Sequence, residues 1–332
     1  MKKIGFLYGK EVNFSVAVMQ KIHEKNIPEL HTEEVIIGIL DTNSKSKYSV
    51  ILDRFSNSFN FYEFALAYFR QNGVKIVSDL KNPLFGDEFS YQTRLKKLKI
   101  HTPKTAIFPS KVLPNGVNGA DLRNLEYPLK WDEMFDEIGL PANIKSNHSS
   151  EFYDCFRIHN RQDFYFIYDM SGTNTLVLQE CIDTQANYRV FVVGDDILFL
   201  RYDLHKAPKD RYSIPEVKPS KEIYNEVDKI VELINKHFDT DMYILDIAVA
   251  DKIYVLNLNS FFMNIDNLML DEGSYNWLVD KTADLLIHSA GVEVKAAKAH
   301  HHADHAAAET KTTATKAKTV TSKKTTKETK TK

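Results

Sequence analysis

Three oxygen-bearing side chains interrupt two otherwise apolar runs in residues 241–260, DMYILDIAVADKIYVLNLNS. Asp246 lies in the first run, and Asn257 and Asn259 lie in the second, beyond a short polar turn. This pattern predicts a hairpin of two paired strands. A polar group buried there without a partner costs about 1–3 kcal/mol. We therefore expect these side chains to face a metal ion, a ligand or another side chain.

A positively charged side chain earlier in the chain also needs a partner. Arg189 lies in the run NYRVFVV, where the expected strand is apolar on both faces. A guanidinium in such surroundings needs an anion. A second cation, Lys145, lies in NIKSN at the end of a short expected strand. From its spacing alone, Lys145 is an exposed lysine at a strand end.

Strand-like and helical patterns alternate over the first hundred residues. The expected strands cover residues 2–9, 33–41, 48–56 and 74–79, and the expected amphipathic helices cover 13–26 and 59–73. Strands that alternate with helices indicate parallel βαβ units. In such units the loops that follow the strands form a ligand-binding edge.

The rest of the chain predicts mixed and then antiparallel structure. The expected strands are 105–111, 140–147, 175–182, 187–203 and the hairpin 241–260, and the expected helices are 127–139, 219–238 and 274–290. We divide the chain into an α/β domain (1–100), a central lobe (101–178), a C-terminal lobe (179–293) and a tail (294–332).

Composition narrows the class of protein. The chain has 332 residues, of which 43% are hydrophobic, so two or three domains with cores are expected. No run approaches the roughly 18 apolar residues of a membrane span, and IGFLYG near the start is too short for a signal sequence. The two cysteines, Cys155 and Cys181, share no metal-site spacing, which suits a reducing compartment. We expect a cytoplasmic protein.

The tail and the body carry opposite charge. Residues 299–332 contain eight lysines and three acidic residues, and their Lys/Thr/Ala composition predicts disorder. The body keeps 35 basic and 42 acidic residues, which argues against non-specific nucleic-acid binding. The tail could bind an acidic surface of a protein partner, but a solubilising or tethering role is the simpler interpretation.

Five segments, in this order, resemble the ATP-grasp superfamily. They are PKTAIFPSK, IGLPANIKSN, LVLQECI, NYRVFVVGDDIL and LDIAVADKIYVLNLNS, and the resemblance extends over residues 48–285. The similar branch contains glutathione-synthetase-like and glutamate-ligase-like carboxylate–amine ligases. The resemblance implies an α/β and α+β fold, with a parallel α/β pre-grasp domain, two ATP-grasp lobes that hold ATP between them, and a disordered tail.

The resemblance also implies which residues would bind ATP. Lys145 would neutralise the phosphates, and the hinge backbone would meet the adenine edge. The hinge residues would be Gln179, Glu180, Cys181 and Ile182. Arg189 would act on a γ-phosphate or an acyl-phosphate intermediate, and the alternative is an internal salt bridge. Gln179 and Glu180 could equally be polar residues of an edge strand.

Metal and substrate positions follow from the same resemblance. Mg²⁺ ions held by Asp246, Asn257 and Asn259 would bridge the ATP phosphates. Asn257 stands where the family has a carboxylate, so it would lend an oxygen but no charge. A substrate-facing set is expected near the same site: Arg201, Asp203 and Arg211.

Other positions depart from the family pattern. The segment KSNHSSEFYDCF, which follows the expected strand of Lys145, has no glycine where the family has a glycine-rich flap, and Glu151 adds negative charge there. Glu88 stands where a second phosphate-binding lysine is expected, although Lys96 or Lys97 could substitute. Each departure removes positive charge or a phosphate-binding backbone.

Two functions are compatible with this pattern. The first is an ATP-dependent ligase that uses ATP and Mg²⁺ to activate a small carboxylate as an acyl phosphate and join it to an amine. The second is a degenerate ATP-grasp protein that serves as a binding, scaffolding or regulatory subunit. Phosphoryl transfer depends on positioning and electrostatic stabilisation. The departures therefore favour the second function.

Overall fold

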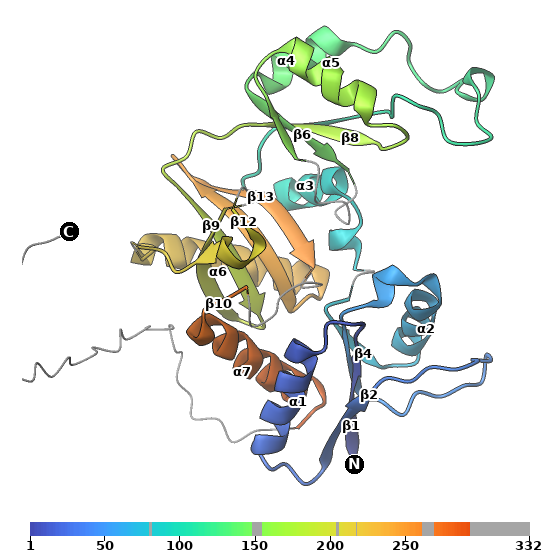
Figure 1. Cartoon of the computed structure of the whole chain (residues 1–332), viewed down its shortest axis with the longest axis vertical. Helices are drawn as coiled ribbons and strands as arrows, with labels where there is room; N and C mark the ends of the chain where they lie inside the picture. The colour runs from blue at the N-terminus through green and yellow to red at the C-terminus, as the bar shows by residue number, and fades with distance from the viewer. Residues whose placement is uncertain (80–81, 148–154, 204–205, 217, 261–268, 293–332) are drawn as a thin grey trace, which may run out of the picture. The chain divides into compact units, whose positions relative to one another are not determined.

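Three β-sheets organise the protein in a computed structural model (Figure 1). The described residues are 1–79, 82–147, 155–203, 206–216, 218–260 and 269–292. Glu151, most of the glycine-free segment and all of the tail lie outside these ranges. Among the described residues, no helix is long and apolar enough to cross a membrane.

The N-terminal sheet has four parallel strands in the order β2-β1-β3-β4, which confirms the expected βαβ pattern. The strands are β1 (Lys2–Leu7), β2 (Leu30–Glu34), β3 (Val50–Asp53) and β4 (Lys75–Val77). Helices α1 (Asn13–Glu24) and α2 (Asn60–Gln71) provide the crossovers, and the 3₁₀ turn η1 (Ser56–Ser58) precedes α2. Side chains alternate across a strand, so α1 packs with Ile4 and Phe6 while α2 packs near Leu7.

The second strand is shorter than the sequence predicts. We expected a strand over residues 33–41, but β2 ends at Glu34. Its single neighbour is β1, and the backbone N–H of Val35 makes the last bond, to the Phe6 carbonyl. Only Leu7 of β1 lies beyond Phe6, so the apolar stretch soon leaves the sheet, and Ile36 and Ile39 lie exposed.

The central sheet is antiparallel, in the order β5-β8-β6-β7. Its strands are β5 (Thr105–Phe108), β6 (Ala142–Ser146), β7 (Phe156–Ile158) and β8 (Leu176–Glu180). Its helices are α4 (Trp131–Ile138) and α5 (Arg161–Met170), and the turn η3 (Gly119–Asp121) lies between β5 and α4. In the core between these helices and the sheet, Phe108 packs edge to face or tilted against Trp131, Phe164 and Tyr168, and the last two rings stack on each other.

The C-terminal sheet is also antiparallel, in the order β11-β10-β9-β12-β13. Its strands are β9 (Ala186–Val193), β10 (Asp196–Tyr202), β11 (Tyr212–Ser213), β12 (Met242–Val249) and β13 (Ile253–Ser260). Helices α6 (Lys221–Phe238) and α7 (Glu272–Ser289) complete this lobe, and the turn η4 (Pro208–Asp210) precedes β11. The expected hairpin is confirmed: β12 and β13 pair with Asp246 opposite Asn257.

A helix that the sequence analysis did not predict joins the two antiparallel sheets. It is α3 (Glu88–Lys97), which follows the turn η2 (Pro83–Phe85). The Asp87 side chain caps it by accepting from the N–H of Ser90. Tyr91 and Leu95 pack into the core of the C-terminal sheet, while the N–H of Glu88 donates to the carbonyl of Asn147 just after β6.

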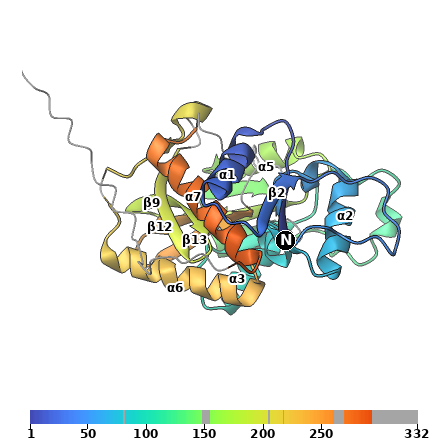
Figure 2. The same cartoon turned by 90° about the horizontal axis from the view of Figure 1, so that it is seen from below.

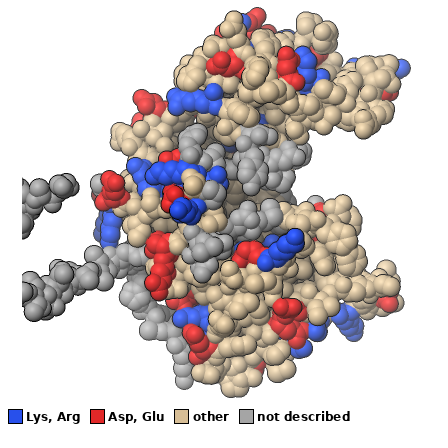
Figure 3. Space-filling model, viewed as in Figure 1, with Lys and Arg blue, Asp and Glu red and all other residues tan. Residues whose placement is uncertain are grey.

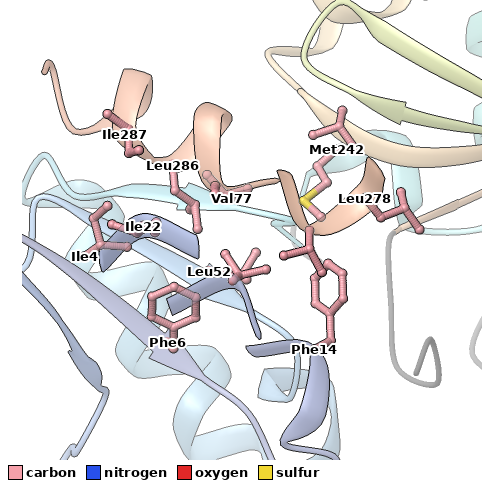
Figure 4. Close-up of a cluster of buried hydrophobic side chains, with 14 of the residues drawn as sticks. Ile4, Phe6, Phe14, Ile22, Leu52, Val77, Met242, Leu278, Leu286 and Ile287 are labelled. Atoms are coloured by element: carbon pink, nitrogen blue, oxygen red, sulfur yellow. The ribbon is translucent and has the colours of Figure 1, made fainter. Parts of the chain in front are cut away.

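One hydrophobic core joins the N-terminal sheet to the C-terminal lobe. Ile4, Phe6 and Leu52 from the first sheet share this core with Leu278 and Leu286 of α7, together with Phe14 and Ile22 of α1 (Figure 4). Figure 2 shows α7 beside α1. Two ion pairs mark their contact, between Lys21 and Asp280 at 2.9 Å and between Lys25 and Asp284 at 2.7 Å.

Candidate functional site

Arg189 forms a two-bond ion pair with Asp246. The two residues face each other in the β9–β12 ladder. Arg189 Nε donates to Asp246 Oδ1 at 2.6 Å, and Arg189 Nη2 donates to Asp246 Oδ2 at 2.7 Å. Both side chains are largely buried, with 6% and 18% of their surfaces exposed. This two-bond geometry is the strong form of a guanidinium–carboxylate contact. The anion that we expected beside Arg189 is therefore the Asp246 carboxylate of the same chain.

Two tyrosines also contact this guanidinium, one by stacking on its face and the other by a hydrogen bond. Arg189 Cζ lies 3.4 Å from the centre of the Tyr202 ring, and Arg189 Nη1 donates to the Tyr212 hydroxyl at 3.1 Å. Burial opposes the charge on Arg189, but the carboxylate of Asp246 outweighs burial and raises the pKa of Arg189 above its ordinary value. Arg189 is therefore a fixed, permanently charged group.

The Asn257 amide is engaged on both sides. Asn257 Oδ1 accepts from the Tyr91 hydroxyl at 2.9 Å and from the N–H of Leu258 at 3.1 Å. Asn257 Nδ2 donates to Asp246 Oδ2 at 3.4 Å. Burial, and then the nearby Glu88 carboxylate, raise the pKa of Tyr91 well above its ordinary value. Tyr91 thus stays a neutral donor that holds the Asn257 oxygen.

Lys145 forms an ion pair with Glu88. Lys145 Nζ lies 2.8 Å from Glu88 Oε1, and the exposed fractions of the two side chains are 14% and 4%. Lys145 projects from β6, and Glu88 is the first residue of α3. Glu88 stands where a second phosphate-binding lysine was expected, and its carboxylate pairs with the first such lysine, Lys145.

Two glutamine side chains complete the surroundings of Glu88. Gln92 Nε2 donates to Glu88 Oε1 at 3.0 Å, one helical turn along α3, and Gln179 Nε2 donates to the same oxygen at 3.4 Å. Both amides also reach the carbonyl of Leu256 in β13, at 3.3 and 3.4 Å. Glu88 Oε1 thus has three partners from the protein, and polar contacts continue through Gln92 and Tyr91 of α3 to β13, where Asn257 bonds to Asp246.

The other expected hinge residues surround the end of β8. The Glu180 carboxylate accepts from the N–H of Lys104 at 3.1 Å. Cys181 and Ile182 are half-buried just beyond the strand. Cys155 is exposed just before β7, within electrostatic range of Lys145 and Cys181. Cys181 lies beyond the end of β8, where Glu180 pairs with Ala142 of β6.

The expected substrate-facing set lies close to Arg189 in the chain, but its side chains contact other groups. Arg201 is exposed and donates to the carbonyl of Asn187 at 2.8 Å, and Arg211 donates to the carbonyl of Lys206 at 3.2 Å. The backbone N–H of Asp203 bonds to the carbonyl of Arg211. The residues that contact Arg189 are the neighbouring Tyr202 and Tyr212, which the sequence analysis missed.

The expected Mg²⁺ ligands do not have the chemistry of a metal site. Both oxygens of Asp246 accept from Arg189, and the oxygen of Asn257 accepts two hydrogen bonds. Asn259 lies on β13, half-buried and opposite Ile244, and brings no charge. Over the described part of the chain, no three His, Cys, Asp or Glu residues form a group that could hold a metal ion. Mg²⁺ needs near-octahedral oxygen coordination, and these residues do not fit it.

A pocket of about 220 Å³ borders Lys145. Its walls are mostly apolar and come from β6, β7, α5 and the start of β8, and among the described residues that line it Lys145 alone is charged. On the face seen in Figure 3, basic and acidic side chains are interspersed. The site therefore offers a small, mainly apolar pocket beside a compensated ion pair.

The fold has many counterparts among solved structures. No protein-family model matches this sequence, and no curated protein matches it. A RimK domain protein ATP-grasp from Sphaerobacter thermophilus is 14% identical, with a TM-score of 0.60 and coverage of 85% of this chain and 98% of that one. D-alanine–D-alanine ligase from Bacillus anthracis is 13% identical, with a TM-score of 0.59 and coverage of 87% and 97%.

A third solved structure contains ligands. It is the ATP-grasp ligase PsnB complexed with minimal precursor, Mg and ADP, which is 12% identical, with a TM-score of 0.57 and coverage of 87% of this chain and 98% of that one. At these identities the likeness shows a shared fold, over almost the whole length of each neighbour.

Proposed function

We propose that this chain, which has the ATP-grasp fold, binds a nucleotide without catalysing ligation and acts as a binding or regulatory subunit. One observation carries the proposal: the Glu88 carboxylate lies 2.8 Å from the Lys145 ammonium, where a ligand phosphate would have to bind. Lys145, Gln179, Glu180, Cys181 and Ile182 are the residues we assign to the nucleotide.

The energetics of that ion pair argue against efficient phosphoryl transfer. A phosphate bound to Lys145 would lie close to Glu88, and two negative charges about 4 Å apart repel by roughly 4 kcal/mol at an effective dielectric constant near 20. That energy corresponds to about a thousandfold in affinity. Glu88 cannot readily move away, because α3 and two glutamines hold it. A bound nucleotide would therefore be held mainly through its base and sugar.

An active carboxylate–amine ligase is the second candidate. The observation that favours it is the polar surroundings of Lys145: its side chain is 14% exposed and contacts hydrogen-bonding groups rather than a sealed apolar core. In that case ATP would displace Glu88, and Arg189 would have to leave Asp246 to act on an acyl phosphate. Small carboxylate and amine substrates would then bind near Arg201, Asp203 and Arg211.

Nucleotide protection of the cysteines tests the binding part of the proposal. Cys155 and Cys181 are the only cysteines; Cys155 lies within electrostatic range of Lys145, and Cys181 is one of the residues assigned to the nucleotide. Alkylation of the wild type, of Cys155→Ser and of Cys181→Ser should slow when ATP or adenosine is added. Equal alkylation rates with and without either compound would show that nothing binds there.

Phosphate release tests the absence of catalysis. Wild type and Lys145→Met should release phosphate from Mg·ATP at the same background rate, with or without mixtures of small carboxylates and amines. Release by the wild type that disappears in Lys145→Met would overturn the proposal in favour of the active ligase. The variant Lys104→Met is the matched control, because Lys104 is an exposed lysine that pairs with Glu137.

A further inference from the structure

We infer that Arg189 is a resident cation that takes the place of a divalent metal at Asp246, so that any nucleotide this protein binds is bound without a metal ion. The inference deepens the proposed function and, for its nucleotide part, rests on it. It concerns the chemical form of the ligand: a free nucleotide or nucleoside rather than a magnesium complex.

Both carboxylate oxygens of Asp246 already accept hydrogen bonds from Arg189. A metal ion at Asp246 would need at least one of them, and each already accepts a charge-assisted hydrogen bond, at 2.6 and 2.7 Å. Asn257 Nδ2 adds a third donor to Oδ2 at 3.4 Å. A metal ion would have to remove donors that match the carboxylate in both charge and geometry.

Arg189 itself cannot readily swing aside. Its guanidinium stacks on Tyr202, bonds to Tyr212 and is 5% exposed as a residue. Tyr202 and Tyr212 face each other across the β10–β11 ladder, with ring centres 5.0 Å apart. One ring thus covers a face of the guanidinium, and the other residue accepts from the one terminal nitrogen that does not bond to Asp246. Releasing it would leave a buried carboxylate and a displaced charge without partners.

Asp246 has no second carboxylate opposite it that could help to hold a divalent cation. The acidic partner of Asp246 on the next strand is absent, because Asn257 occupies that position and its oxygen is bound by Tyr91. One carboxylate and one guanidinium already sum to zero charge. A divalent cation would therefore meet repulsion from Arg189 with no second carboxylate to offset it.

Magnetic resonance with Mn²⁺ tests this directly in the wild-type protein. The Arg189 Nε–H gives a proton–nitrogen signal that can be assigned by its disappearance in Arg189→Lys. We expect excess Mn²⁺ to leave this signal unbroadened, both alone and with a non-hydrolysable ATP analogue. Broadening by Mn²⁺ alone would mean that a metal binds beside Asp246, and broadening only with the analogue would mean that the nucleotide brings one. Either result overturns the inference.

A gain-of-binding variant provides the converse test. Arg189→Gln combined with Asn257→Asp removes the resident cation and restores a second carboxylate, so the folded variant should take up one Mn²⁺, seen as loss of free Mn²⁺ signal in electron paramagnetic resonance. A folded variant that binds no Mn²⁺ would mean that Arg189 is not what excludes the metal. If the variant fails to fold, the wild-type measurement decides alone.

The two proposals fail in different ways. If neither ATP nor adenosine slows alkylation of the cysteines, the proposed function is contradicted. In that case the Arg189 signal can still be unaffected by Mn²⁺. A protein that is protected, and whose Arg189 signal broadens with Mn²⁺ and the analogue, contradicts the resident cation while keeping nucleotide binding.

Discussion

Glu88 Oε1 and Lys145 Nζ lie 2.8 Å apart, and they come from elements 57 residues apart in the chain. The contact exists because α3 begins at Glu88 and its first turn meets the end of β6, through the Glu88 N–H bond to the Asn147 carbonyl and the Phe89 N–H bond to Asn147 Oδ1. A helix N-terminus favours a carboxylate, so the helix itself stabilises the anion that neutralises Lys145.

Tyr91 is the link between the two ion pairs, and its hydroxyl should contribute measurably to stability. Tyr91→Phe removes the donor to Asn257 Oδ1 and should lower the free energy of unfolding by about 1 kcal/mol. Urea denaturation measures the change. Tyr254→Phe is the matched control, because its hydroxyl donates to Asp251 at the surface, and the change there should be under about 0.5 kcal/mol. Equal costs for the two variants would contradict the role of Tyr91.

The shared hydrophobic core should couple the N-terminal sheet to the C-terminal lobe. Leu278→Ala opens a cavity in a fully buried part of α7 and should cost about 2–5 kcal/mol. Hydrogen exchange should then speed up in β1 as well as in β12, because the core contains Ile4 and Met242.

The central lobe offers the control for this coupling. Phe164 is also fully buried, but in the separate core beneath α4 and α5. Phe164→Ala should speed exchange in β6 and β8 with little effect on β1. Faster exchange confined to α7 in Leu278→Ala would contradict a shared core.

The Asp53 carboxyl should make stability depend on pH. Burial raises the pKa of Asp53 to about 6 from 3.8, against hydrogen bonds from Ser56 and Phe55 that lower it. The folded state therefore holds this proton more tightly, and the stabilisation is full below about pH 4 and lost as the pH rises through 6. Asp53→Asn has no such proton, so its stability relative to wild type should rise by roughly 3 kcal/mol between pH 4 and 7. A flat difference, measured by urea denaturation, would contradict the raised pKa.

Local sequence pattern was enough for the elements with regular periodicity. The parallel N-terminal unit and the β12–β13 hairpin were predicted from alternation alone, including the polar interruptions at Asp246 and Asn257. The length of β2 was not predicted, because a strand can continue only as far as the neighbouring strand offers backbone groups for pairing. That neighbour is β1, whose paired residues lie 28 positions earlier in the sequence.

The partners of the charged residues were harder to predict. The sequence indicated that Arg189 needs an anion but left a phosphate and an internal carboxylate as alternatives. The choice depends on the register of β9 against β12, 57 residues away. Tyr202 and Tyr212 could have been identified from the alternation of side chains along a strand. Each follows an arginine that we had assigned to substrate, so the tyrosine projects to the opposite face of the sheet from that arginine. Helix α3 was missed although Asp87 is a good N-cap and Arg94, Lys96 and Lys97 suit its last turn.

Internal charges occupy the groups of this protein that would otherwise hold phosphate and metal. We would measure the consequence by calorimetric titration of ATP into wild type and Glu88→Gln, each in excess Mg²⁺ and in a chelator. The surface variant Glu137→Gln controls for the change of net charge.

We predict weak binding by the wild type that is the same with and without Mg²⁺. Glu88→Gln should bind ATP at least tenfold more tightly, since the repulsion of roughly 4 kcal/mol is removed and Lys145 gains a free charge. Glu137→Gln should behave as wild type. Tight binding of ATP by the wild type that requires Mg²⁺ and is not improved by Glu88→Gln would contradict the account.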